Sequence, residues 1–200
     1  QAAGKIPVNF RALQVDAMTI SAHKLHGPRG VGGLLLRHGA QVTPQLHGGG
    51  QQLAQRPGTE PVELGLAMAA ALRLAIEEAP RYESLYRLRQ QIETELQTID
   101  PTCVIHGADS ARLPQTISVS FLGIDRQALV MALDLAGVCI STGSACASGS
   151  SEPSPVLLAM GLENEQIESA VRFSLGRDST AEETVEAARR ISNCIKELRR

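Results

Sequence analysis

The sequence has few aromatic residues and no excess of charge of either sign. Aromatic residues make up 2% of the 200 residues, there is no Trp, and the formal net charge is −2. A nucleic-acid-binding surface needs clustered positive charge and stacking rings, so this composition argues against one. No apolar run reaches the roughly 18 residues of a membrane span, and the first residues lack the basic and then apolar pattern of a signal peptide. These absences predict a cytoplasmic protein without a membrane or direct nucleic-acid partner.

The four cysteines also lack any metal-ligand spacing. No Cys-x-x-Cys pair occurs among Cys103, Cys139, Cys146 and Cys194. A chain of this length buries a core without disulfides. We therefore predict free thiols and no metal site. Cys103 and Cys139 lie in apolar, strand-like surroundings, which predicts that both are small core residues.

Hydrophobic periodicity divides the chain into three parts. Residues 1–61 alternate short apolar runs with Gly and Pro turns, which is typical of a parallel or mixed α/β sheet. Residues 62–100 have the period of two helices that connect two domains. Residues 101–200 mix strands, among them a predicted strand over 138–141, with helices, and predict a small α+β domain. Asp125 is a predicted N-cap, and Thr180-x-x-Glu183 matches a capping box.

A reactive lysine is predicted between two strands of the first part. Ser21-Ala22-His23-Lys24 is followed by Gly27-Pro-x-Gly-x-Gly, with apolar runs on both sides. A lysine on a turn punctuated in this way is partly desolvated, and burial disfavours its ammonium form. A solvated loop lysine is the alternative.

A second reactive group is predicted at Cys146, where the segment 141–150 reads Ser-Thr-Gly-Ser-Ala-Cys-Ala-Ser-Gly-Ser. Its neighbours are all small, so nothing next to it in the sequence buries the sulfur. Ordinary surfaces avoid an exposed free cysteine, whereas a small-residue loop suits a nucleophile that moves between two partners. The alternative is that Cys146 is a surface thiol without a function.

Together these segments resemble the class V aminotransferase superfamily and, within it, the cysteine desulfurases with a long active-cysteine loop. The likeness rests on Ser-Ala-His-Lys at 21–24 and Ser-x-Gly-Ser-Ala-Cys at 141–146. His47-Gly-Gly-Gly-Gln and Arg56-Pro-Gly-Thr-Glu extend it, and it covers the whole chain. The resemblance implies an α/β fold of type I: residues 1–61 form the C-terminal part of the large mixed or parallel-sheet cofactor domain, and residues 101–200 form the small domain.

The resemblance also implies a cofactor, pyridoxal 5'-phosphate. By their match to the family motif, Lys24 is the Schiff-base lysine, Ser21 and His23 bind the cofactor phosphate, and Gln1 contacts the 3'-oxygen of the ring. Thr59 matches a threonine that reaches the phosphate of a neighbouring subunit, which implies a homodimer.

The implied reaction converts L-cysteine to L-alanine and leaves a persulfide on the protein. Lys24 takes the Cα proton, Cys146 attacks the substrate sulfur, and Arg172 in Val-Arg-Phe-Ser pairs with the substrate carboxylate. The family passes this sulfur to an acceptor, either an iron-sulfur scaffold or a tRNA-thiolation carrier.

Other interpretations are a selenocysteine lyase or aminotransferase on the same fold, or an inactive fragment that serves as an interaction module. The run at 27–33 lacks the Gly-x-x-x-x-Gly-Lys order of a mononucleotide loop. His23-x-x-His26 has no third ligand nearby for a metal ion.

The chain starts without Met, as if within an ordered segment, and the family places earlier residues of the cofactor domain before Gln1. Among them are a histidine stacked on the ring and an aspartate paired with its nitrogen. We predict that these 200 residues alone, mixed with pyridoxal phosphate and L-cysteine, do not turn over. Removal of one preorganised electrostatic group typically costs about 10²–10³ in rate. Assays of alanine and sulfide test this, and turnover within tenfold of roughly 10 s⁻¹ contradicts it.

Overall fold

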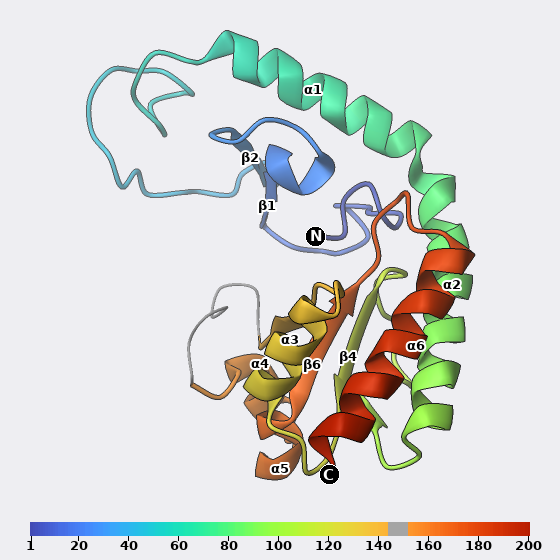
Figure 1. Ribbon diagram of the computed structural model, residues 1–200. Helices are drawn as coiled ribbons and strands as arrows, with labels where there is room; N and C mark the ends of the chain where they lie inside the picture. The colour runs from blue at the N-terminus through green and yellow to red at the C-terminus, as the bar shows by residue number, and fades with distance from the viewer. Residues whose placement is uncertain (144–151) are drawn as a thin grey trace. The chain divides into compact units, whose positions relative to one another are not determined.

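The computed structural model describes residues 1–143 and 152–200. The chain forms two compact units, Gln1–Pro80 and Arg81–Arg200. Figure 1 shows both units in chain order, and each is described here by itself.

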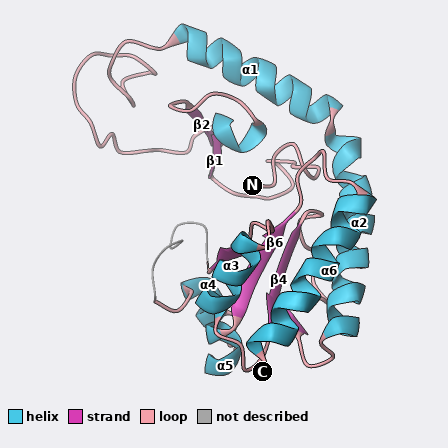
Figure 2. Cartoon of the chain, in the orientation of Figure 1, coloured by secondary structure: helices cyan, strands magenta, loops and turns pink. Residues whose placement is uncertain are grey.

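The first unit is built on a strand, turn and strand followed by a long helix. Strand β1 (Ala17–Ser21), the short 3-10 helix η1 (Ala22–Leu25) and strand β2 (Gly32–Leu36) precede helix α1 (Val62–Glu77). Both predicted strands are confirmed. They pair with each other in antiparallel fashion, with Ser21 opposite Gly32. Figure 2 shows the two strands in magenta.

The second unit is a four-stranded antiparallel sheet with helices. Its strands lie in the order β3-β4-β6-β5, and every neighbouring pair is antiparallel. In chain order the elements are α2 (Ala79–Ile99), β3 (Val104–Ile105), β4 (Thr116–Ser120), α3 (Arg126–Leu135), β5 (Ser141–Thr142), α4 (Pro155–Ala159), α5 (Asn164–Glu168), β6 (Ala170–Ser174) and α6 (Ala181–Leu198).

One face of this sheet forms the main hydrophobic core. Alternate residues of the two central strands, such as Val119 and Val171, pack in one cluster with apolar side chains from helices α2, α3 and α6. The core members from the helices are Ile92, Leu96, Leu129, Leu133, Ile191, Cys194 and Ile195. Since strand side chains alternate between faces, the opposite face of the sheet carries the remaining, mostly polar residues. A smaller apolar cluster of Leu157, Ile167 and Ala170 joins α4 and α5 to this second face.

The predicted caps are confirmed. The Asp125 carboxylate accepts a hydrogen bond from the Ala128 amide at 2.8 Å. Thr180 and Glu183 form the reciprocal capping box at the start of α6.

The predicted strand over 138–141 is wrong for most of its length, because only Ser141 and Thr142 pair with β6. The Val138 amide instead donates to the Leu133 carbonyl at 2.8 Å, which holds this segment against the end of α3. Val138 and Ile140 pack against the core, and Cys139 between them is exposed. The prediction of a core residue is therefore wrong for Cys139, whereas Cys103 is buried as predicted.

No helix in the described part of the chain is long and apolar enough to cross a membrane.

A buried histidine lies on the second face of the sheet. His106 is 4% exposed, and its Nε2 lies 2.7 Å from the Ser120 hydroxyl. That hydroxyl donates its own proton to the Gln166 carbonyl, so it accepts from His106, and Nε2 carries the ring proton. Nδ1 is then a bare acceptor, buried without a hydrogen-bond partner among the described residues. Burial lowers the pKa of His106 below its usual 6.5.

This lowered pKa predicts a loss of stability in mild acid. Below about pH 6.5 the unfolded chain binds a proton that folded His106 does not yet bind, so the free energy of unfolding falls as pH drops toward the folded pKa. The slope is at most about 1.4 kcal/mol per pH unit. Urea unfolding at about pH 7.5 and about pH 5.5 measures it. Wild type loses more stability than His106→Asn, and equal losses contradict the prediction.

Candidate functional site

The turn that carries Lys24 is anchored to helix α1 by small and buried residues. Ala22 and Leu25, on either side of His23 and Lys24, are 0% and 5% exposed. The Gly27 amide donates to the Ala22 carbonyl at 2.9 Å. A Cβ at Gly27 would lie 3.0 Å from the Ala71 side chain, so glycine permits this close approach to α1. The anchoring leaves Lys24 half-buried on a well-supported turn.

A second lysine lies beside the first. The Lys5 ammonium donates to the Lys24 carbonyl oxygen and to the Gln1 side-chain oxygen, each at 3.3 Å. Burial, followed by the positive charge of Lys24, lowers the pKa of Lys5. Neither lysine forms an ion pair with a carboxylate of the described residues. This part of the first unit therefore holds positive charge that the described protein groups do not neutralise.

The other predicted cofactor residues lie on this turn, directly before it, or on a separate loop. Ser21 is the last residue of β1 and directly precedes the turn. His23 is exposed on the turn itself. Thr59 is exposed in the long connection between β2 and α1. The structure thus brings Gln1, Ser21, His23 and Lys24 together and leaves Thr59 on a separate loop.

In the second unit, Arg172 lies on the polar face of the sheet. It stands in β6, opposite Ser118 of β4 and Ser141 of β5. The side chain is half-buried, and the structure records no hydrogen bond or ion pair between it and another described residue. A partly buried guanidinium without a partner is costly, so this position suits an anion.

A cavity of about 410 Å³ contains this arginine. Its polar lining includes His106, Ser118 and Ser154, whose buried hydroxyl has no hydrogen-bond partner in the described part of the structure. Leu157 and Met160 supply apolar lining. We call this space the Arg172 cavity. Its size and mixed lining suit a small polar molecule.

The remaining predicted site residue, Cys146, lies outside the described residues. Among the described cysteines, Cys103 and Cys194 are buried, and burial raises the pKa of Cys103 to about 11. The described residues contain no group of three or more His, Cys, Asp or Glu side chains placed to hold a metal ion.

Comparison with known proteins identifies the family. The model of the class-V aminotransferase family matches residues 1–187. The chain belongs to the class-V aminotransferase family. Cysteine desulfurase of Nostoc sp. is 44% identical over 90% of the chain and 45% of its own length. Cysteine desulfurase IscS of Aeromonas salmonicida is 42% identical over 100% of the chain and 49% of its own length. The chain thus spans about half the length of these curated relatives.

Solved structures agree with this assignment. A NifS-like protein superposes with a TM-score of 0.85 at 33% identity, over 99% of this chain and 51% of that one. A NifS-like protein from Rickettsia africae superposes with a TM-score of 0.86 at 30% identity, over 97% of this chain. The predicted type I fold is confirmed.

Class-V aminotransferases depend on pyridoxal phosphate, and the first unit offers groups that fit this cofactor. Its phosphate is anionic, and the unneutralised charge of Lys5 and Lys24 favours an anion there. Ser21 and His23 add hydrogen-bonding side chains to the same turn. Lys24 would form the covalent link, since its turn carries the family motif.

Two side chains of the candidate sites were not predicted from the sequence, namely Lys5 beside the Lys24 turn and His106 in the lining of the Arg172 cavity. Lys5 precedes Lys24 by a long stretch of sequence, and no local pattern connects them; only folding places its ammonium on the Lys24 carbonyl. His106 follows a short strand, and its place beside Ser120 depends on the pairing of β3 with β4.

We predict that pyridoxal phosphate attaches to Lys24. Incubation with the cofactor, borohydride reduction and peptide mapping locate the modified lysine. Lys24→Arg abolishes the label. Lys5→Arg is the matched control, because Lys5 is the nearby lysine with the lowered pKa, and this variant keeps the label. A label that persists in Lys24→Arg, on Lys5 or elsewhere, contradicts the assignment.

Proposed function

We propose that this protein acts as a cysteine desulfurase that converts L-cysteine to L-alanine and leaves the sulfur as a persulfide on Cys146. The observation that carries the proposal is the half-buried Arg172, which has no hydrogen-bond or ion-pair partner among the described residues and lies in a small cavity of mixed polar and apolar lining. An amino acid presents a carboxylate, and the planar fork of arginine binds it at two points. Curated relatives named cysteine desulfurase support the choice of substrate.

The cofactor supplies the electron sink that allows bonds at the substrate Cα and Cβ to break. Gln1, Ser21, His23 and Lys24 would hold it in the first unit. The Lys24 amine acts as general base and takes the proton from Cα. Its anchored turn keeps that amine in place, since Ala22 and Leu25 are buried against the unit's interior.

Cys146 supplies the nucleophile. Its thiolate attacks the substrate sulfur, the S–S bond forms as the C–S bond breaks, and the three-carbon skeleton takes up protons and leaves as alanine. Arg172 keeps the carboxylate in place during this exchange. The persulfide sulfur then passes to an acceptor protein, an iron-sulfur scaffold or a tRNA-thiolation carrier, as the family resemblance implies.

We further propose that the enzyme works as a homodimer in the cytoplasm. The support for the dimer is the match of Thr59 to a threonine that serves the neighbouring subunit. Thr59 is exposed on its loop, as such a role requires.

We predict that Cys146 is the only cysteine needed for sulfur transfer. In the pyridoxal-phosphate-loaded enzyme that contains this chain, Cys146→Ser lowers sulfide release from L-cysteine, with a reductant present, by at least about 100-fold. Cys139→Ser is the matched control, because Cys139 is the exposed cysteine among the described residues. Cys103 and Cys194 are buried with raised pKa values and stay protonated near neutral pH. Normal turnover by Cys146→Ser, with loss in Cys139→Ser, rejects the assignment.

A further inference from the structure

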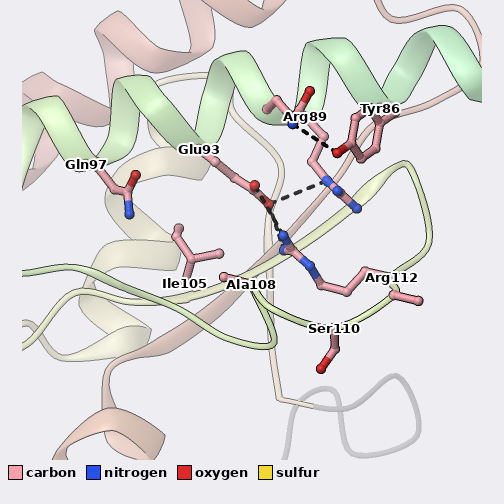
Figure 3. Close-up of a pocket in the computed structure, with 10 residues that line it drawn as sticks. Tyr86, Arg89, Glu93, Gln97, Ile105, Ala108, Ser110 and Arg112 are labelled. Carbon is pink, nitrogen blue, oxygen red and sulfur yellow. Dashed lines mark hydrogen bonds and ion pairs between the residues drawn. The ribbon is translucent and has the colours of Figure 1, made fainter.

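The loop between β3 and β4 forms a wall shared by two cavities. Residues 107–113 make up this segment, which we call the wall loop. On one side, residues of this loop and of helix α2 together line a cavity of about 410 Å³, and Figure 3 shows the side chains around it. On the other side Gly107, Ser110 and Arg112 line the Arg172 cavity. Ser110 and Arg112 line both spaces, so the position of this loop sets the shape of each.

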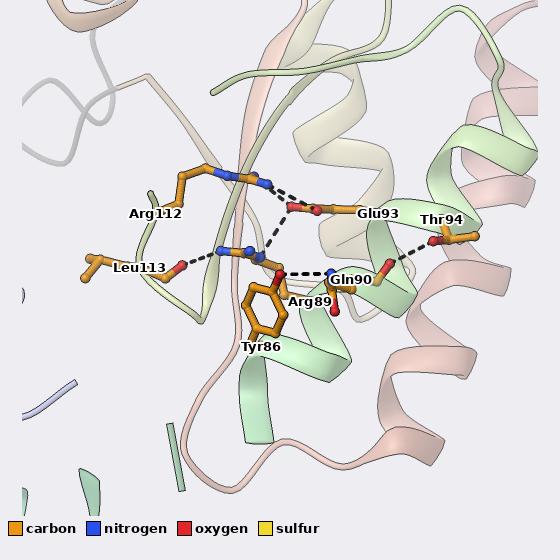
Figure 4. A network of polar contacts seen from close by, with 7 residues as sticks. All are labelled: Tyr86, Arg89, Gln90, Glu93, Thr94, Arg112 and Leu113. Carbon is orange, nitrogen blue, oxygen red and sulfur yellow. Dashed lines mark hydrogen bonds and ion pairs between the residues drawn. The ribbon is translucent and has the colours of Figure 1, made fainter. Parts of the chain in front are cut away.

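Three charged side chains clasp the wall loop to helix α2 (Figure 4). The Arg112 guanidinium donates to both Glu93 carboxylate oxygens, at 2.7 and 3.3 Å. Arg89 Nε lies 3.5 Å from the same carboxylate, and Arg89 Nη1 donates to the Leu113 carbonyl at 2.8 Å. Glu93 and Arg89, one turn apart on α2, therefore hold two successive residues of the loop.

This clasp is shielded from water. The side chains of Arg89, Glu93 and Arg112 are 5%, 14% and 16% exposed. Charges in such surroundings interact more strongly than on an open surface. Because Arg112 is paired with Glu93, the arginine without an ion-pair partner among the described residues lining the Arg172 cavity is Arg172 itself.

The start of the wall loop is hydrogen-bonded to β4 at the residue that stands opposite Arg172. The His106 amide donates to the Ser118 carbonyl at 2.8 Å, and Ser118 stands opposite Arg172. Gly107 has a φ of +66°, and a Cβ there would lie 3.6 Å from Arg112 Cδ. The aliphatic part of the Arg112 side chain thus lies close to Gly107 at the start of its own loop, next in sequence to His106.

We propose that Arg112, held by Glu93 and Arg89, positions the wall loop at the Arg172 cavity and thereby sets the affinity for L-cysteine. Arg112 is a positioning residue, because Glu93 occupies its guanidinium. When the clasp is broken, the wall loosens and more water reaches Arg172, which is half-buried in the intact structure. The pairing of Arg172 with the substrate carboxylate weakens as the surroundings become more polar. This inference rests on the proposed function.

The test compares Arg112→Met with wild type in the pyridoxal-phosphate-loaded enzyme that contains this chain. Hydrogen exchange of 107–113 and the steady-state constants for L-cysteine are measured on the same preparations. We expect faster exchange of the wall loop and a KM raised by about threefold to thirtyfold, with kcat within about twofold of wild type. Arg189→Met is the matched control. It removes a two-point Arg–Glu pair, at 2.8 and 2.7 Å, from the exposed surface of α6, and it changes neither readout.

Each other outcome decides the proposal. An unchanged KM, with or without a lower kcat, shows a purely structural clasp and overturns it. If Arg112→Met does not fold, Arg112→Lys replaces it in the test, because lysine keeps the charge but loses the two-point fork. A smaller rise in KM for Arg112→Lys supports the proposal, and an unchanged KM rejects it. If wild type releases no sulfide from L-cysteine, the proposed function fails. The exchange comparison then stands alone, and equal exchange in wild type and Arg112→Met rejects the clasp.

Discussion

Burial of alternate residues along β6 decides where Arg172, the proposed substrate-binding arginine, lies. Val171 and Phe173 pack into the core formed with helices α2, α3 and α6. Arg172 between them must then lie on the opposite face, since successive side chains of a strand alternate. The same alternation in β4 places Ser118 beside it. The hydrophobic effect that folds the second unit therefore also presents an arginine on a polar face, where no described protein group neutralises it.

The structure treats its positive charges in two different ways. At Lys24 and Lys5, and again at Arg172, charge is partly buried without a carboxylate partner in residues 1–143 and 152–200, and such charge is stabilised by an anionic ligand. At the clasp, by contrast, the Glu93 carboxylate pairs with Arg112 at 2.7 Å and lies 3.5 Å from Arg89. In the proposed function, the unpaired charges are the places for cofactor phosphate and substrate carboxylate, whereas the ion-paired Arg112 holds a loop. In the proposals made above, this difference separates the groups that bind a ligand from the group that positions a loop.

Local sequence patterns predicted the elements of the fold well. The strands around Lys24, the helices from 62 to 99 and the capping box of Thr180 and Glu183 all follow from periodicity and end signals over short stretches. The strand predicted over 138–141 was wrong because an apolar run there packs against the core without a pairing partner for most of its length. Propensity cannot reveal a partner, since pairing depends on distant strands.

The sequence by itself determined the family and predicted the cofactor lysine and the candidate nucleophile, because Ser-Ala-His-Lys and Ser-x-Gly-Ser-Ala-Cys are contiguous motifs whose chemistry is carried by adjacent residues. Only the tertiary structure decided that Lys5 lies on the Lys24 carbonyl, that Cys139 is exposed, and that Arg112 is paired with Glu93 while Arg172 has no ion-pair partner among the described residues. These facts depend on contacts between residues far apart in the chain. Such contacts exist once strands have paired and helices have packed, and no spacing along the sequence records them.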